Sequence, residues 1–123
     1  MIAGTVNAAR EARIPLTLRA PLGATQEVDA LIDTGFDGFL TLPPNLIAAL
    51  GLKRLARGLA ILADGREQLF DIHAVTVLWD GQPLTVEADS ADTEPLVGMG
   101  LLQGYGLSIE VVDGGAVEIQ RLS

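Results

Sequence analysis

Three of the four Asp-Gly pairs in this chain lie between two short apolar runs, and they constrain its fold more than any other feature of the sequence. Asp-Gly favours tight hairpin turns, because the central residues of such a turn can require a positive φ. The three pairs are Asp64-Gly65, Asp80-Gly81 and Asp113-Gly114. The apolar runs that flank them are residues 59–62 and 68–72, 75–79 and 84–86, and 107–112 and 116–119. Each pair therefore predicts a β-hairpin.

Two earlier runs, residues 14–18 and 28–32, also read as strands, with Gly23 between them. Seven or more short strands in 123 residues predict an all-β fold, a small closed or folded β-barrel. Apolar residues make up 49% of the chain and charged residues 20%, which is enough to build a core. No linker or repeat divides the sequence, so we expect one domain over residues 1–123.

Two short helices are expected to interrupt the strands. Pro44 suits a first helical position and Gly51 suits a C-terminal cap, so the intervening apolar residues predict a helix over 44–50. Residues 101–103, between two glycines, predict a single helical turn.

The acidic composition excludes two classes of partner. Asp and Glu number 16 against 8 Lys and Arg, which gives a formal net charge of −8 and a pI near 4.4. Nucleic acids and anionic membranes select for Lys and Arg, so we expect neither as a partner. The chain has no cysteine, and no apolar run approaches the length of a membrane span. These features favour a cytoplasmic protein.

Patterns for other chemistries are weak. His73 is the only histidine, and no serine lies in a nucleophile-elbow context, which argues against a Ser-His-Asp triad. We interpret Asp89, Asp92 and Glu94 as a solvated acidic loop, since they lack the clustering of metal ligands. We expect neither a metal nor another cofactor.

The tripeptide Asp33-Thr34-Gly35 follows the apolar run 30–32, which places a carboxylate at the end of a buried strand. A carboxylate in such a position is costly unless hydrogen bonds or a function keep it there. Taken alone, the tripeptide favours a turn aspartate that accepts backbone hydrogen bonds.

Three further segments follow this loop in an order that is typical of one family. They are Leu40-Thr41-Leu42-Pro43 before the first helix, the hairpin tip Ala63-Asp64-Gly65-Arg66, and residues 95–102 with the sequence PLVGMGLL. With these segments, the chain resembles the retropepsin-like aspartic peptidases, of the small single-domain type found in bacteria and archaea.

The resemblance implies an aspartic endopeptidase that hydrolyses polypeptides. Asp33 would be one half of the catalytic dyad, in which two adjacent carboxylates share one proton and activate a water. Thr34 would brace the two active-site loops against each other. Gly35 would let the backbone adopt the needed dihedrals and approach the substrate.

The chain contains no second Asp-Thr-Gly or Asp-Ser-Gly, so the other half of the dyad must come from elsewhere. A C2 homodimer supplies it, because the two-fold axis brings Asp33 against its symmetry mate. In the family the chain ends often pair across the dimer, and residues 116–119 would serve here. The alternative is a catalytically inactive module of the same fold, used for dimeric peptide binding or assembly.

Residues beside the tripeptide and at the hairpin tip are candidates for substrate binding. Phe36 stands where the family has a small residue, and would narrow the cleft or form an apolar subsite. Asp37 either holds the substrate backbone or is a solvated turn carboxylate paired with an arginine. The tip residues Asp64, Gly65 and Arg66 either contact the substrate or form an ordinary hairpin tip. A second departure from the family is Gly100, where many relatives carry Asp or Asn.

Overall fold

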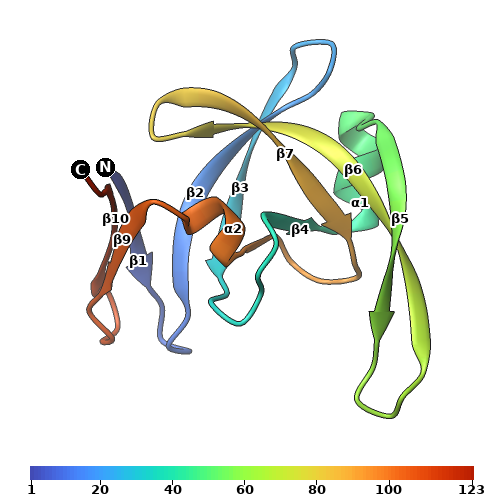
Figure 1. Ribbon diagram of the computed structural model, residues 1–123. Coiled ribbons are helices and arrows are strands. Elements are labelled where there is room, and N and C mark those ends of the chain that lie inside the picture. The colour runs from blue at the N-terminus through green and yellow to red at the C-terminus, as the bar shows by residue number, and fades with distance from the viewer.

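The computed structural model describes all residues from 1 to 123, and contains ten strands and two short helices (Figure 1). The helices are α1 (Pro44–Leu50) and α2 (Met99–Leu102). The strands are β1 (Ile2–Val6), β2 (Ala12–Arg19), β3 (Thr25–Ile32), β4 (Leu40–Leu42), β5 (Arg54–Ile61), β6 (Glu67–Trp79), β7 (Gln82–Ser90), β8 (Leu96–Val97), β9 (Tyr105–Ile109) and β10 (Ala116–Arg121).

Six of the strands close into a barrel, which confirms the predicted all-β barrel. The hydrogen-bonded order β2-β3-β8-β4-β7-β6 is closed by a second pairing of β6 with β2, through Thr17↔Leu78 to Arg19↔Thr76. Strand β5 continues the sheet beyond β6 as the outer half of a hairpin. Beyond β2, the sheet continues as β1, β10 and β9.

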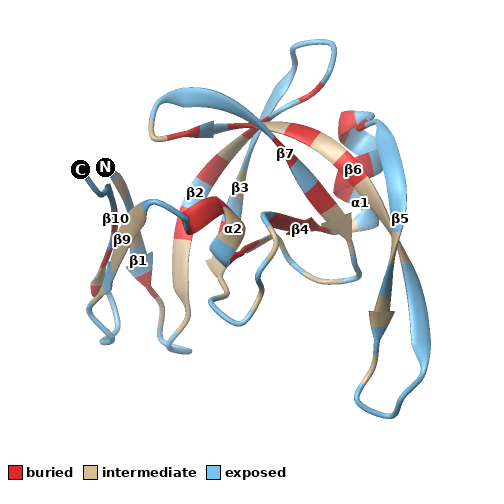
Figure 2. Ribbon diagram, viewed as in Figure 1, coloured by how far each residue is buried: buried red, intermediate tan, exposed pale blue.

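The core lies inside this barrel and under the C-terminal strands. Buried side chains alternate along β2, β6 and β7, as Ile14, Leu16 and Leu18 do on β2, whereas all three residues of the short β4 are buried. Figure 2 shows this burial along β2, β6 and β7, whereas β5 and the tip of its hairpin are largely exposed. Trp79 is part of the core and packs edge-to-face on Tyr105, with ring centroids 5.8 Å apart.

All three predicted hairpins form, as β5–β6, β6–β7 and β9–β10. Only the middle turn has two positive φ angles, 53° at Asp80 and 81° at Gly81. In the other two turns the glycine alone has a positive φ, 85° at Gly65 and 79° at Gly114. A positive φ at both central residues is therefore found in one of the three turns, and in the other two turns only the glycine has it.

Several strand boundaries differ from those expected. The runs 68–72 and 75–79 form one strand, β6, because its first half pairs with β5 and its second half with β7. His73 lies between the two halves and is buried. Strand β9 ends at Ile109 instead of continuing to residue 112, since the connection to β10 is a six-residue turn.

Helix α1 forms over residues 44–50, as predicted. Helix α2 spans Met99–Leu102 instead of residues 101–103, so it includes Gly100, which was expected to bound it. Helix α1 begins with Pro44 in its first turn and ends at Gly51 in the left-handed conformation, with φ of 62° and ψ of 40°. The Gly51 N–H donates to the carbonyls of Ala48 and Ile47, as expected for a glycine cap. Neither helix has the length and apolar character that a membrane-spanning helix requires.

Candidate active site

Asp33 follows directly on β3, at the end where that strand pairs in parallel with β8. Its backbone N–H donates to the carbonyl of Val97 over 2.9 Å, which continues the β3–β8 ladder by one step. Ala30, three residues earlier, is fully buried. The position of Asp33 is thus set by the barrel.

The Asp33 carboxylate is oriented by its own turn. The Gly35 N–H donates to Oδ1 over 3.0 Å, and the Phe36 N–H donates to the Asp33 carbonyl over 3.2 Å. Oδ2 makes no hydrogen bond within the chain. The residue is half-buried, while Thr34 and Gly35 are exposed. One carboxylate oxygen is therefore held by the turn, and the other has no partner within the chain.

The loop of residues 33–39, here called the Asp33 loop, is joined to the start of α2 by backbone hydrogen bonds. The Gly98 N–H donates to the Phe39 carbonyl over 3.0 Å, and the Met99 N–H donates to the Phe36 carbonyl over 2.7 Å. The Gly100 N–H donates to the Gly38 carbonyl over 2.9 Å. These bonds join segments about 60 residues apart in the sequence.

Glycines allow the Asp33 loop and the start of α2 to approach each other this closely. A Cβ on Gly98 would lie 2.3 Å from the carbonyl oxygen of Gly38 and 2.5 Å from the Phe36 ring. A Cβ on Gly38 would also lie 2.5 Å from that ring, and one on Gly100 would lie 2.9 Å from the Gly38 carbonyl oxygen. The glycine that departs from the family at position 100 therefore has a steric reason in this chain.

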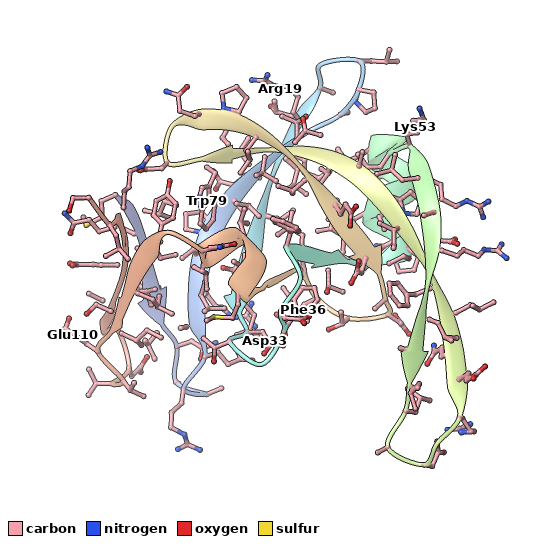
Figure 3. The ribbon with its side chains drawn as sticks, viewed as in Figure 1. Arg19, Asp33, Phe36, Lys53, Trp79 and Glu110 are labelled. Carbon is pink, nitrogen blue, oxygen red and sulfur yellow. The ribbon has the colours of Figure 1, made fainter.

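Phe36 is half-buried, and its ring occupies the space over Gly38 and Gly98. Figure 3 shows Phe36 and Asp33 as neighbours on the same loop. The ring packs on its own loop and on the segment behind it, which favours a structural role for this residue.

Gly35 was expected to be needed for its backbone dihedrals, and this expectation is wrong. Gly35 is not among the glycines with a positive φ, and the nearest atom to a Cβ placed there is Asp33 Oδ1, at 3.3 Å. Apart from its chain neighbours Thr34 and Phe36, nothing else approaches within 4 Å. The chain alone therefore gives no steric requirement for glycine at this position.

An ion-pair cluster supports the strands that carry Asp33. The guanidinium of Arg13 on β2 pairs with Glu11, with Asp29 on β3 and with Glu94 just before β8. The Glu94 and Glu11 carboxylates hold the pKa of Arg13 well above its usual value, against the opposing effect of burial. Glu94 lies in the exposed bend before β8, as expected, and its carboxylate also joins this bend to β2 through Arg13.

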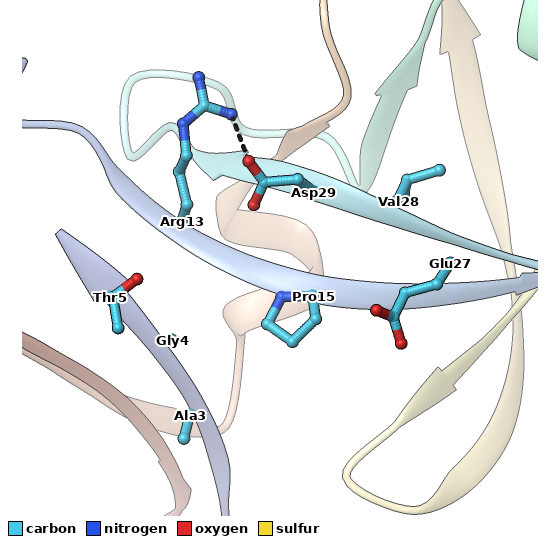
Figure 4. A pocket seen from close by; sticks show the side chains of 8 residues that line it. All are labelled: Ala3, Gly4, Thr5, Arg13, Pro15, Glu27, Val28 and Asp29. Carbon is cyan, nitrogen blue, oxygen red and sulfur yellow. Dashed lines mark hydrogen bonds and ion pairs between the residues drawn. The ribbon is translucent and has the colours of Figure 1, made fainter. Parts of the chain in front are cut away.

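The Arg13–Asp29 pair borders a surface hollow of about 520 Å³ on the outer face of β1, β2 and β3 (Figure 4). Exposed residues such as Thr5, Pro15 and Glu27 line it. The hollow lies on the strands that support Asp33 and includes no residue of the Asp33 loop.

A second cavity, of about 290 Å³, lies between the β5–β6 hairpin and the barrel. Thr41 on β4 and Asp89 on β7 line it from the barrel, and Phe70 lines it from β6. The Phe70 ring lies across its strand partner Gly58, where a Cβ would be 2.2 Å from the ring. This cavity has the form of a short cleft beneath the hairpin.

Asp89 was expected in a solvated loop, but it is a half-buried residue of β7 in this cleft. Burial raises its pKa, and the nearby charges of Glu87 and Asp37 raise it further. The alternation of buried Val86 and Ala88 could have indicated a strand through Asp89.

Asp37 is exposed and forms no ion pair with an arginine. Its charge contributes, after burial and Glu87, to the raised pKa of Asp89. Asp37 is thus a solvated carboxylate without the expected arginine partner, and its contact with a substrate stays a prediction.

The structure does not bring the hairpin tip to Asp33 within one chain. Figure 1 shows the β5–β6 hairpin projecting from the barrel, with its tip apart from the Asp33 loop. At the tip, both the backbone N–H and the guanidinium of Arg66 donate to the Asp64 carboxylate. The Gly65 N–H donates to the Leu62 carbonyl over 2.9 Å. The polar groups of the tip are thus used locally.

The sequence matches no protein-family model, and a comparison with curated proteins gave no match. Two solved structures are similar in fold. A retropepsin-like aspartic protease from Rickettsia conorii has a TM-score of 0.61 at 17% identity, over 99% of this chain and 91% of that chain. EIAV protease complexed with the inhibitor HBY-793 has a TM-score of 0.58 at 19% identity, over 79% of this chain and 89% of that chain. The protein therefore has the fold of the retropepsin-like aspartic proteases.

Proposed function

We propose that this protein is an aspartic endopeptidase whose catalytic dyad forms from the Asp33 residues of two identical chains. The observation that carries the proposal is the state of the Asp33 carboxylate. Its Oδ1 accepts the Gly35 N–H, while Oδ2 and the exposed Thr34 have no side-chain hydrogen bond within the chain. An oriented carboxylate at the surface of a rigid loop suits pairing with a second carboxylate.

The chemistry of such a pair is peptide hydrolysis. One carboxylate accepts a proton from a water molecule as the water oxygen adds to the peptide carbonyl carbon, and the other carboxyl group supplies a proton to the carbonyl oxygen. When the C–N bond then breaks, the nitrogen takes a proton from the dyad and leaves as an amine, while one hydroxyl of the gem-diol returns its proton to the dyad and the carboxylic acid product forms. Two apparent pKa values, which belong to the pair, would limit activity to a bounded pH range.

The surroundings of the loop fit this role. Gly35 is exposed and sterically unconstrained by its own chain, so a substrate backbone or a second loop can approach it closely. The cleft between the β5–β6 hairpin and the barrel would receive substrate side chains, with Phe70 and Thr41 on its walls. In this proposal Asp37 holds the substrate backbone beside the dyad, and Phe36 supports the loop.

The second candidate is a dimeric peptide-binding or assembly module without catalysis. The hairpin tip favours it, because Asp64 and Arg66 bind each other and leave fewer groups for a substrate. This module would use the same cleft and would not need the Asp33 carboxylate.

Cleavage of an unfolded polypeptide at mildly acid pH separates the two functions. The peptidase predicts cleavage by the wild type and, for Asp33→Asn, a loss of about 10²–10⁴-fold. Asp80→Asn is the matched control, because Asp80 lies in the turn between β6 and β7 and not in the Asp33 loop. This variant should retain full activity. Cleavage that survives Asp33→Asn would reject the dyad, and a confirmed dimer that never cleaves would favour the binding module.

A further inference from the structure

The register of β7 places Asp89 on the outer face of the barrel, in the cleft beneath the β5–β6 hairpin. Asp89 pairs with Thr41 on β4 and with Ile72 on β6, so the three residues form one row across three strands. The neighbouring Ala88 is fully buried in the core. Because successive side chains of a strand point to opposite faces, Asp89 points outward. Figure 1 shows this end of β7 between β4 and the hairpin.

The Asp89 carboxylate has no partner within the chain. Its side chain is half-buried, yet it forms neither an ion pair nor a hydrogen bond. Burial raises its pKa, and the charges of Glu87 and Asp37 raise it further. Burial of a carboxylate costs free energy unless a cation or a set of hydrogen-bond donors offsets it. No group of this chain supplies that offset.

A second polar group opens on the same cleft. Thr41 is only 6% exposed, and its hydroxyl makes no hydrogen bond within the chain. The only side-chain polar atoms that are shut away from solvent without a partner are His73 Nδ1 and Trp79 Nε1. The Thr41 oxygen is therefore open to the cleft that the residue lines. An otherwise buried hydroxyl in this state favours a ligand that supplies a hydrogen bond.

The walls of the cleft carry negative charge and no positive charge. Asp92 lines the cleft from the bend after β7, beside Asp89, and no lysine or arginine is among the residues that line it. Phe70 and Ala60 supply apolar surface from the hairpin side. The cavity of about 290 Å³ therefore combines an acidic wall with an apolar one.

The side chain that matches both walls has an apolar stem and a cationic end. Lysine and arginine bury their methylene groups against apolar surface while the charged end stays with polar groups. The stem would pack on the Phe70 ring, whose face also attracts a cation. The ammonium or guanidinium group would donate hydrogen bonds to the Asp89 carboxylate and the Thr41 hydroxyl. A purely apolar side chain would leave both groups unpaired, and an acidic one would be repelled by Asp89.

We propose that the cleft beneath the hairpin selects a lysine or arginine side chain of the bound polypeptide, and that Asp89 determines this specificity. The inference rests on the proposed function, which makes a polypeptide the ligand of the cleft. Asp89 acts on binding and takes no part in the proton transfers assigned to Asp33. The net charge of −8 adds an unspecific attraction for basic polypeptides, which the test has to separate from the effect of Asp89.

Two pools of short fluorescent peptides with blocked ends test this selection. Both are built from alanine, valine, leucine and phenylalanine, but one central position is lysine in the first pool and norleucine in the second. Binding is measured by fluorescence anisotropy on the Asp33→Asn chain, so that cleavage does not interfere. We expect the lysine pool to bind about fivefold more tightly, as for a partly exposed ion pair.

Adding Asp89→Asn should abolish this preference by weakening the lysine pool alone, since the norleucine pool makes no ion pair. Asp80→Asn is the matched control, because it removes the same charge from the turn between β6 and β7. It should keep the preference. General damage to the cleft is a different result, because it would weaken both pools alike.

The outcomes separate the specificity from the catalytic proposal. Equal binding of the two pools, binding of neither pool, or a lysine preference that survives Asp89→Asn would overturn the inference. A preference that Asp80→Asn reduces as much would also overturn it, because the attraction would then come from the net charge. A preference lost through Asp89→Asn alone would support it even if the wild type cleaves neither pool, and that lack of cleavage would count against the peptidase only.

Discussion

The Asp33 loop and the tip of the β5–β6 hairpin belong to the same proposed site, but the chain holds them in different ways. The Asp33 loop is bonded to residues 97–100, far away in the sequence, and the Phe36 ring fills the space over Gly38 and Gly98. The tip forms its bonds among residues 62–66 and projects away from the barrel. The fold of one chain therefore fixes the catalytic loop and leaves the position of the tip to other contacts.

This difference has a consequence for dynamics. Segments with few buried contacts and local hydrogen bonds open at low free energy, whereas segments joined to the core open only with it. We expect the Asp33 loop to exchange its amide hydrogens as slowly as the barrel strands, and the tip to exchange much faster. Substitutions of similar size in the two regions should then lower the free energy of unfolding by unequal amounts.

The largest effect is expected for Gly98→Ala. Its φ of −100° and ψ of 177° suit any residue, so the penalty is steric: the new Cβ would meet Gly38 and Phe36. Overpacking against backbone should lower the free energy of unfolding by about 3 kcal/mol, measured by urea unfolding, and should reduce activity with it. Stability close to that of the wild type would show that the Asp33 loop moves to accommodate the new Cβ at little cost. The loop would then be no more firmly fixed than the hairpin tip.

Phe36→Ala comes next. Removing a half-buried ring that covers Gly38 and Gly98 should cost about 2 kcal/mol, below the value for a fully buried phenylalanine. Phe39→Ala is the control, since Phe39 is 40% exposed and should cost less. Unchanged stability with an altered cleavage preference would instead make Phe36 a substrate subsite.

Gly65→Ala at the hairpin tip should have a smaller effect. No atom lies within 4 Å of the place that its new Cβ would take, so the cost comes from the φ of 85° alone and is about 1 kcal/mol. Gly65→Asn should cost less, because asparagine tolerates this conformation better. A loss as large as that of Gly98→Ala, in the same urea titration, would mean that the tip is packed as firmly as the Asp33 loop.

The smallest effect on the free energy of unfolding is expected for Asp89→Asn. Asp89 lies in the cavity between the β5–β6 hairpin and the barrel. The pKa of Asp89 is raised by burial and by the charges of Glu87 and Asp37, so its ionisation costs the folded state free energy. The variant should therefore be more stable at neutral pH, by less than about 1 kcal/mol because the group is partly exposed. The difference should vanish at acid pH, where Asp89 is protonated in both folded and unfolded chains. Thermal unfolding across pH measures this, and a difference that persists in acid would reject the electrostatic cause.

The sequence predicts much of the fold because local signals agree with it. The Asp-Gly pairs give the three hairpins, and Pro44 with Gly51 bounds α1. Strands β1, β4 and β8 were missed, since their two to five residues become strands only through partners distant in the sequence.

Within the site, the tripeptide at Asp33 could be located from sequence, but its packing could not. The position of the Phe36 ring depends on glycines about 60 residues further along the chain. Asp89 in the cleft was hidden by a turn-like acidic segment, although the alternation along β7 carried the signal. From sequence, Val111 and Val112 were expected to end a strand, whereas the structure places both exposed in the turn after β9.

Mixing wild-type chains with Asp33→Asn chains tests the shared dyad most directly. Both chains keep the same surface, so they should exchange freely, and a mixed dimer would hold one aspartate and one asparagine. At equal amounts and constant total protein, the account predicts about one quarter of the all-wild-type activity, because only wild-type pairs are active. Activity of about one half would mean that each chain hydrolyses peptides by itself, and would contradict a site built from two copies of Asp33.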